Sequence, residues 1–141
     1  MHGVLLQDWT CVLSSSAADS IAQSELLWLD VDDYRDAIFW LECKSVVLGG
    51  ASAVVLAYQS SATKDEALFA SMSTFPLGVT SVPFITKVLE AQDPAIPLSR
   101  WLRWRIQIAG TPSSAWGATF RIFCALNPSG PNVPAPNEAA P

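Results

Sequence analysis

The chain has 141 residues, of which 50% are hydrophobic and only 15% are charged, with 8 Lys and Arg against 13 Asp and Glu. This length fits one domain with its own core, and the composition is too apolar for a chain that is disordered throughout. A net charge of −5 provides no basic surface for nucleic acid or an anionic membrane, so we expect neither as a partner.

The shortage of charge needs an explanation other than a membrane. An average soluble domain carries about 25% charged residues, about 14 more than this chain has. The longest weakly polar run, residues 46–58, is shorter than a spanning helix, which needs about 20 residues. The first residues, MHGVLLQDWTCVL, have no basic segment and include Asp8, so they do not resemble a signal peptide. We therefore expect synthesis in the cytoplasm and a surface covered by other protein subunits.

Hydrophobic residues alternate with a period of two along most of the chain, which predicts β-strands. The expected strands are residues 4–13, 25–31, 37–47, 51–58, 67–73, 79–90, 101–108 and 118–126. Residues 17–29 also fit a helix, and residues 67–72 fit a single helical turn. About eight short strands separated by Gly, Pro and Ser predict an all-β antiparallel sandwich that is jelly-roll-like.

Two turns predict hairpins between consecutive strands. Gly49 and Gly50 supply the positive φ that tight hairpin turns require, between residues 37–47 and 51–58. Residues 110–114 (GTPSS) predict a longer hairpin that joins residues 101–108 to residues 118–126.

The C-terminal segment, residues 128–141, contains five of the ten prolines and one charge, Glu138. Because proline fixes φ and has no N–H to donate to a sheet, we expect a β-sandwich domain at residues 1–127 and an extended arm at residues 128–141. At the polyproline rise the arm reaches about 40 Å, far enough to lie on a neighbouring chain.

The sequence offers little chemistry. His2, at the N-terminus, is the one histidine, and a base held there is poorly placed to activate a nucleophile. No glycine-rich phosphate loop, zinc spacing or dinucleotide motif is present. We therefore expect a protein that is not an enzyme and has no cofactor.

Two smaller features of the sequence also lead to predictions. The acidic stretch at residues 30–36 (DVDDYRD) fits either a solvated turn or a calcium loop, since carboxylates are the ligands that calcium prefers. Cys11, Cys43 and Cys124 are an odd number of widely spaced thiols, which predicts buried free cysteines rather than disulfides. Free thiols suggest a reducing compartment during synthesis.

The most distinctive surface is the polar face of residues 101–108, which presents Trp101, Arg103 and Arg105. Arg121 and Phe123 would extend it across the predicted hairpin. Three roles remain open for these residues: a subunit interface, where Trp and Arg are enriched, a site for a glycan or small ligand, or packing within the chain.

Two sets of residues follow from these roles. The predicted interface includes the prolines of the arm, Pro128, Pro131, Pro134 and Pro136. The alternative function, a carbohydrate-binding module for host or glycan attachment, would use the rings of Trp101 and Trp116.

Three segments together resemble a known group of proteins. YRDAIFWLE (34–42), PLSRWLRWRIQIAG (97–110) and ATFRIFCAL (118–126) are similar to small β-sandwich structural proteins of tailed bacteriophages and prophage-like elements, a group that includes capsid decoration and other minor virion proteins. The resemblance implies a virion protein that coats or completes a shell or tail. Its partners would be further copies of itself and a larger assembly such as a capsid or tail.

Overall fold

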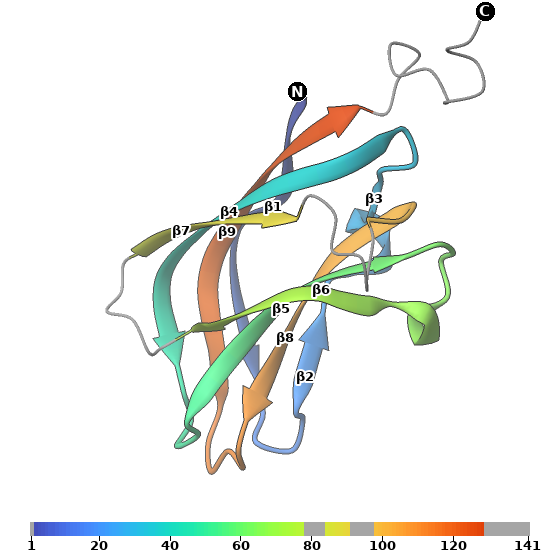
Figure 1. Cartoon of the computed structure of the whole chain (residues 1–141). Coiled ribbons are helices and arrows are strands. Elements are labelled where there is room, and N and C mark those ends of the chain that lie inside the picture. Colours follow the sequence, from blue (N-terminus) through green and yellow to red (C-terminus); the bar gives the residue numbers. More distant parts are fainter. Residues whose placement is uncertain (1, 78–83, 91–97, 129–141) are drawn as a thin grey trace, which may run out of the picture.

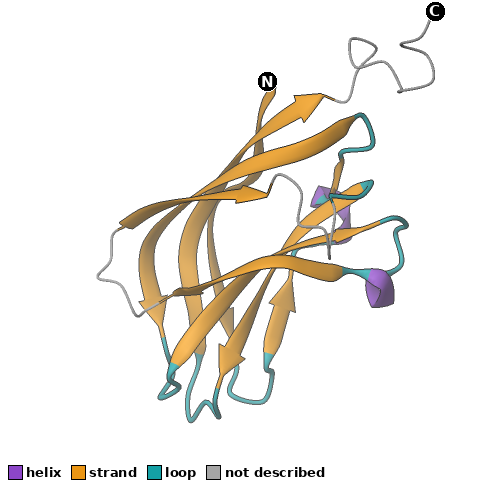
Figure 2. Ribbon diagram, viewed as in Figure 1, coloured by secondary structure: helices purple, strands orange, loops and turns teal. Residues whose placement is uncertain are grey.

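The computed structural model describes residues 2–77, 84–90 and 98–128 of the chain. These residues form nine β-strands and two single-turn 3-10 helices, η1 and η2 (Figures 1 and 2). The elements are β1 (His2–Ser14), β2 (Ser20–Ala22), η1 (Glu25–Leu27), β3 (Leu29–Asp30), β4 (Tyr34–Val47), β5 (Ala53–Ser61), η2 (Glu66–Leu68), β6 (Ala70–Leu77), β7 (Phe84–Glu90), β8 (Trp101–Ala109) and β9 (Trp116–Pro128).

The strands form two antiparallel sheets that pack face to face (Figure 1). Sheet A has the order β1-β9-β4-β7, and sheet B has the order β2-β8-β5-β6, with β3 also paired to β8. Because β2 and β3 pair with successive parts of β8, they act as one interrupted edge strand. The strand order is then that of a jelly roll, and the predicted all-β sandwich is confirmed.

Both predicted hairpins are wrong, because the chain crosses between sheets at these turns. β4 pairs with β9 and β7, and β5 pairs with β8 and β6. Gly49 does have a positive φ of 59°, but it serves an inter-sheet connection. Its carbonyl accepts a 2.8 Å hydrogen bond from the Ser113 amide in the β8–β9 connection. The two connections therefore brace each other at one end of the sandwich.

Other boundaries differ from the expected ones. The predicted strand at residues 25–31 is η1 followed by the two residues of β3, and the alternative helix at residues 17–29 is absent. The predicted strand at residues 67–73 begins as η2 before β6. Within residues 79–90, β7 accounts for Phe84–Glu90, and residues 79–83 lie outside the described residues.

The core lies between the sheets and is held by aromatic pairs that join them. Phe39 of β4 stacks on Tyr58 of β5 with ring centroids 4.2 Å apart. Trp104 of β8 meets Phe120 of β9 edge to face at 5.0 Å. Such pairs add about 0.5–1.5 kcal/mol each to the burial of their area, so they fix how one sheet sits on the other.

The three thiols are free, but their burial differs. Cys43 and Cys124 are buried as predicted, whereas Cys11 is exposed, which contradicts the prediction for that residue. Cys11 lies on the edge strand β1, where one face is open to solvent. Burial raises the pKa of Cys124 to about 12.

In the part of the chain that the structure describes, no helix is long and apolar enough to cross a membrane.

Candidate functional site

The sandwich separates residues that the sequence had placed on one surface. Trp101, Arg103 and Arg105 belong to β8 in sheet B, whereas Arg121 and Phe123 belong to β9 in sheet A. The two sheets pack through their inner faces, so the outward side chains of β8 and β9 point away from each other. The predicted extension of one polar face across a hairpin is therefore wrong.

Arg103 is packed within the chain. Only 2% of the residue is exposed, and its guanidinium carbon lies 4.0 Å from the ring centroid of Phe69 and 5.2 Å from that of Trp28. Phe69 directly follows η2, and Trp28 directly follows η1. The two rings meet edge to face with their centroids 4.7 Å apart. Trp28 and Phe69, which follow the two 3-10 turns, thus cover Arg103 and form an aromatic clamp.

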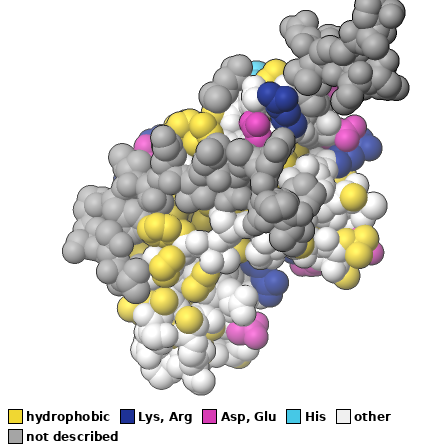
Figure 3. All heavy atoms as spheres, viewed as in Figure 1, with side chains coloured by type: hydrophobic (Ala, Val, Ile, Leu, Met, Phe, Trp, Pro, Cys, Tyr) yellow, Lys and Arg dark blue, Asp and Glu magenta, His cyan; other side chains and the backbone are white. Residues whose placement is uncertain are grey.

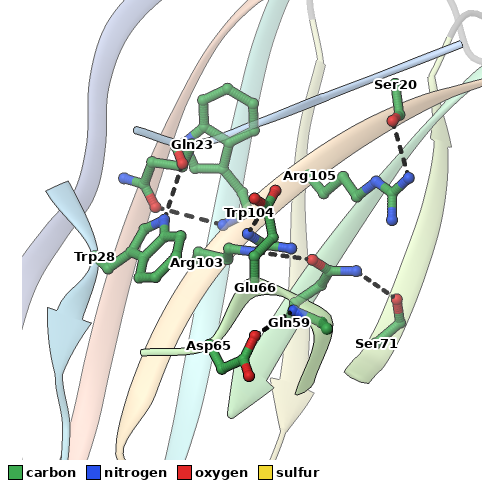
Figure 4. Close-up of polar contacts among 11 residues, drawn as sticks. Ser20, Gln23, Trp28, Gln59, Asp65, Glu66, Ser71, Arg103, Trp104 and Arg105 are labelled. Carbon is green, nitrogen blue, oxygen red and sulfur yellow. Dashed lines mark hydrogen bonds and ion pairs between the residues drawn. The ribbon is translucent and has the colours of Figure 1, made fainter. Parts of the chain in front are cut away.

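Polar partners complete this clamp. Arg103 Nε donates to Gln59 Oε1 at 2.9 Å, and Gln59 in turn donates to Ser71 Oγ (Figure 4). Glu66 Oε1 lies 3.5 Å from Arg103 Nη1, although the Glu66 side chain is 76% exposed. Desolvation lowers the pKa of Arg103, and the charge of Glu66 opposes that shift. These contacts correspond to packing within the chain, one of the three roles left open for Arg103.

The other predicted residues of this region also have partners within the chain. Trp101 is half-buried, and Lys64 Nζ lies 4.4 Å from its ring centroid. Arg105 donates to Ser20 Oγ at 2.8 Å (Figure 4). Trp116 is 0% exposed, and its indole N–H donates to the Ala18 carbonyl. Trp116 therefore presents no ring face on which a sugar could stack.

Among the four prolines of the predicted interface, Pro128 is the one that lies within the described residues. Pro128 is the last residue of β9 and pairs with Tyr34, since a proline is tolerated at a strand end where no further ladder bond is needed. Pro131, Pro134 and Pro136 lie outside the described residues.

The acidic stretch at residues 30–36 is tied to neighbouring side chains. The Asp30 carboxylate accepts from the Asp32 amide and lies 3.2 Å from Arg100 Nη2; these contacts hold the pKa of Asp30 below its ordinary value. Asp36 pairs with Arg35 at 3.8 Å. Over residues 2–77, 84–90 and 98–128, no three His, Cys, Asp or Glu side chains are gathered as a metal site would require.

An apolar pocket opens on the outer face of sheet A, with a volume of about 410 Å³. Its lining residues come from three adjacent strands and are Gly3, Val4, Leu5, Trp40, Phe123, Cys124 and Ala125. Gly3 pairs with Ala125, and these two small residues leave the space open. Phe123 pairs with Leu5 on one side and with Trp40 on the other, so larger side chains border that space.

A row of cations and rings continues from this pocket along β9. The guanidinium carbon of Arg121 lies 4.6 Å from the Phe123 ring centroid and 4.8 Å from that of Trp9. Lys44 Nζ lies 4.0 Å from the Trp9 centroid. Glu42 accepts two hydrogen bonds from Arg121. The charges of Glu42 and Arg121 cancel, so the net charge of the row is the single positive charge of Lys44.

Irregular pairing helps to bring this row together. β1 shifts register against β9 between Leu5 and Gln7 and again between Gln7 and Thr10, and β4 shifts between Cys43 and Ser45. A bulge re-aims the side chains beside it. Trp9 lies within the shift between Gln7 and Thr10, and Lys44 lies within the shift between Cys43 and Ser45; these two residues meet over β9.

Sequence reasoning found Arg121 and Phe123 in this region but missed Gly3, Trp9 and Trp40. A signal for Trp40 was available: within residues 37–47, the outward-facing set contains Trp40 beside Glu42 and Lys44. A large apolar residue on the charged side of a strand indicates an outer face that is not simply solvated.

A second groove lies between β1 and η1, with a volume of about 370 Å³. Leu26 and Leu27 contribute to it and are 93% and 53% exposed. Leu5 lines both this groove and the pocket on sheet A, whereas Leu26 and Leu27 line this groove and not that pocket.

On the face shown in Figure 3, charged side chains form small separate groups amid uncharged surface. That distribution is the structural counterpart of the low charge content of the chain.

Comparisons with known proteins identify a related fold. No family model matches the chain, and no curated protein matches it. A solved structure described as "Crystal structure of PBSX exported protein XepA" is similar to the chain with a TM-score of 0.52 and 12% sequence identity, over 99% of this chain and 41% of XepA. The chain thus spans less than half the length of XepA, and the likeness concerns the fold.

Proposed function

We propose that the chain is a non-enzymatic structural protein of a phage or phage-like particle, and that it binds neighbouring subunits through the outer face of sheet A. The observation that carries this proposal is the apolar pocket and its adjoining row of rings and cations. The partners would be other copies of the chain and a larger assembly such as a capsid or tail. The protein would be made in the cytoplasm and reside in the particle.

The chemistry of this face favours a protein partner. Trp and Arg are enriched at the energetic centres of interfaces, and Trp9, Trp40 and Arg121 lie together here. The pocket is lined by apolar side chains, and apart from the indole of Trp40 and the buried thiol of Cys124 none can donate a hydrogen bond. A sugar would leave most of its hydroxyls unpaired in such a site, whereas an apolar side chain would not.

Two likenesses support the association with phage. The chain shares its fold with a protein described as "PBSX exported protein XepA", and three of its segments resemble structural proteins of tailed bacteriophages and prophage-like elements. A jelly roll is also an architecture of viral capsid proteins. Together with the apolar outer face, these points support a role in a particle.

The experiment asks whether the protein is a component of a particle and which of its faces binds to the particle. Particles produced from the genome that encodes the chain would be purified on a density gradient and probed with an antibody. We expect wild-type protein in the particle fraction and loss of most of it for the double variant Trp40→Ala, Phe123→Ala. Leu26→Ser is the matched control, because it removes an exposed apolar side chain from the other groove.

Two outcomes would contradict the proposal. Wild-type protein that never sediments with particles would exclude a structural role in them. Equal loss for the Leu26→Ser control would mean that the outer face of sheet A is not the attachment surface. Selective binding on a glycan array that Trp101→Ala abolishes would favour the carbohydrate-binding alternative instead.

A further inference from the structure

The pocket on sheet A and the proline-rich segment that follows β9 fit each other chemically. We propose that the pocket receives a proline from residues 131–136 of a second copy of this chain. This inference rests on the proposed function, in which the outer face of sheet A is the contact surface. It adds which segment binds to that surface.

The pocket has the features that proline recognition uses. Aromatic-lined grooves bind proline-rich segments because the proline ring is apolar and the extended backbone loses little conformational entropy. Here Trp40 and Phe123 supply the rings, and the small residues Gly3 and Ala125 leave the space between them. A Cβ added at Gly3 would meet no heavy atom within 4 Å, so this side of the pocket is open.

The chain itself contains the matching ligand. Residues 129–141 read SGPNVPAPNEAAP, with four prolines and one charged residue, Glu138. The spacing Pro131, Pro134 is the PxxP pattern of segments that dock in aromatic grooves. The segment follows directly on Pro128 at the end of sheet A.

Spacing and charge support a particular register. Lys44 lies beside Phe120 and Thr119 in the β4–β9 pairing, three to four residues from Phe123, or about 10–13 Å along a strand. Pro134 and Glu138 are four residues apart, or about 12 Å in a polyproline helix. With Pro134 in the pocket, Glu138 would therefore reach Lys44. Lys44 forms no ion pair among the residues described.

The direction of β9 favours a second copy over the same chain. β9 stays extended through Pro128, which pairs with Tyr34, and the Asn127 side chain donates to Asp36. Up to its last described residue the strand therefore runs away from Phe123, and the chain would have to reverse to reach its own pocket.

Two variants that each lack one half of the contact provide the test. Deletion of residues 129–141 removes the ligand, and Gly3→Trp fills the pocket. We expect wild-type protein to self-associate with rising concentration in analytical ultracentrifugation, and each variant alone to remain monomeric. An equimolar mixture should form a one-to-one heterodimer, because one partner retains the pocket and the other the ligand. Unchanged melting temperatures would show that both variants fold.

Charge exchange tests the register. We expect Glu138→Lys to weaken self-association about three-fold, the scale of one exposed ion pair. Combining it with Lys44→Glu should restore the wild-type value. Absence of restoration would overturn the pairing of Glu138 with Lys44.

The remaining outcomes separate this inference from the proposed function. Absence of a heterodimer in the mixture would overturn the inference. A wild-type chain that stays monomeric while the mixture associates would place the segment in the pocket of its own chain and overturn the role of a second copy. If the deletion variant still enters particles but Trp40→Ala, Phe123→Ala does not, the proposed function stands and the inference fails. If neither change affects incorporation, both fail.

Discussion

Arg103 shows how a charged residue can belong to the interior of a chain with few charges. Its guanidinium lies against two rings and donates to Gln59, while the exposed Glu66 stays largely in water. Arginine suits this position because its planar group is weakly hydrated and stacks on aromatic faces. The residue joins η1, η2 and β8.

Removal of Arg103 is therefore expected to be costly. We expect Arg103→Ala to lower the free energy of unfolding by about 2–4 kcal/mol, through lost cation–π contacts and a broken buried network. Glu66→Gln and Arg105→Ala should each cost at most about 1 kcal/mol, because the Glu66 side chain is itself 76% exposed and Arg105 is only partly buried. Urea denaturation followed by tryptophan fluorescence measures all three. Equal effects would mean that the aromatic clamp contributes nothing specific.

The three thiols should differ in reactivity. At pH 8 we expect a thiol reagent such as DTNB to modify Cys11 rapidly, and Cys43 and Cys124 only after denaturation, because burial raises the pKa of both buried thiols. Cys11→Ser should abolish the rapid phase. Two rapid equivalents in the native protein would contradict the burial of one of these thiols.

The same pKa shift makes stability depend on pH in a defined direction. The Cys124 thiol ionises near 9.0 when unperturbed and at about 12 in the folded protein. The unfolded chain therefore loses this proton first as pH rises, and the free energy of unfolding falls between these values. Below pH 9.0 the contribution is fully present. Cys124→Ala should make the decline shallower, as denaturation at pH 8, 9, 10 and 11 would show.

At the level of elements, periodicity predicted strands but not their partners. The alternation in residues 101–108 reflects burial on one face, which is a local property, and β8 matches it closely. Whether β8 pairs with β9 or with β5 depends on contacts between distant residues. Glycines at a turn indicate a reversal, but they do not distinguish a hairpin from a crossing between sheets.

The candidate site was partly predictable for the same reason. Arg121 and Phe123 were recognised from their own strand. The pocket also needs Gly3 and Trp40, which lie far away in sequence and reach Phe123 through the pairing of β9 with β1 and β4. The 3-10 turn at Glu25–Leu27 was missed because three residues are too few to show a helical period, whereas the turn at Glu66–Leu68 overlaps the single helical turn that residues 67–72 fit.

The close approach of β1 and β9 gives a test at this scale. A Cβ on Gly117 would lie 1.8 Å from the Val12 carbonyl oxygen, a backbone atom that cannot move without its strand. We expect Gly117→Ala to cost about 3 kcal/mol or more. Gly3→Ala, on the same strand pair but facing open space, should change stability by less than about 0.5 kcal/mol. Similar melting temperatures for the two variants would contradict the pairing of β1 with β9.

At the level of the whole molecule, the two ends of the described chain meet. His2 pairs with Leu126, and Tyr34 pairs with Pro128. We expect a circular permutant that joins residue 128 to His2 by a short Gly/Ser linker, opened after the exposed Lys64, to retain the fold. Its melting temperature should fall by no more than about 5 °C, measured by circular dichroism.

A second permutant, opened after Pro112, provides the matched control. Its break lies in the connection where Ser113 donates to Gly49, so we expect a clearly lower melting temperature. If both permutants lose stability equally, the bracing between the two inter-sheet connections is not significant.

The position of β9 has a consequence for synthesis. β9 lies between β1 and β4, yet among the strands described it is the last to leave the ribosome. Until it is complete, both of its neighbours keep an open edge, the kind of surface that pairs with other chains and aggregates. A nonsense mutation just before Trp116 would therefore be as harmful as one near the start of the gene, because the product lacks the strand on which half of the sandwich closes.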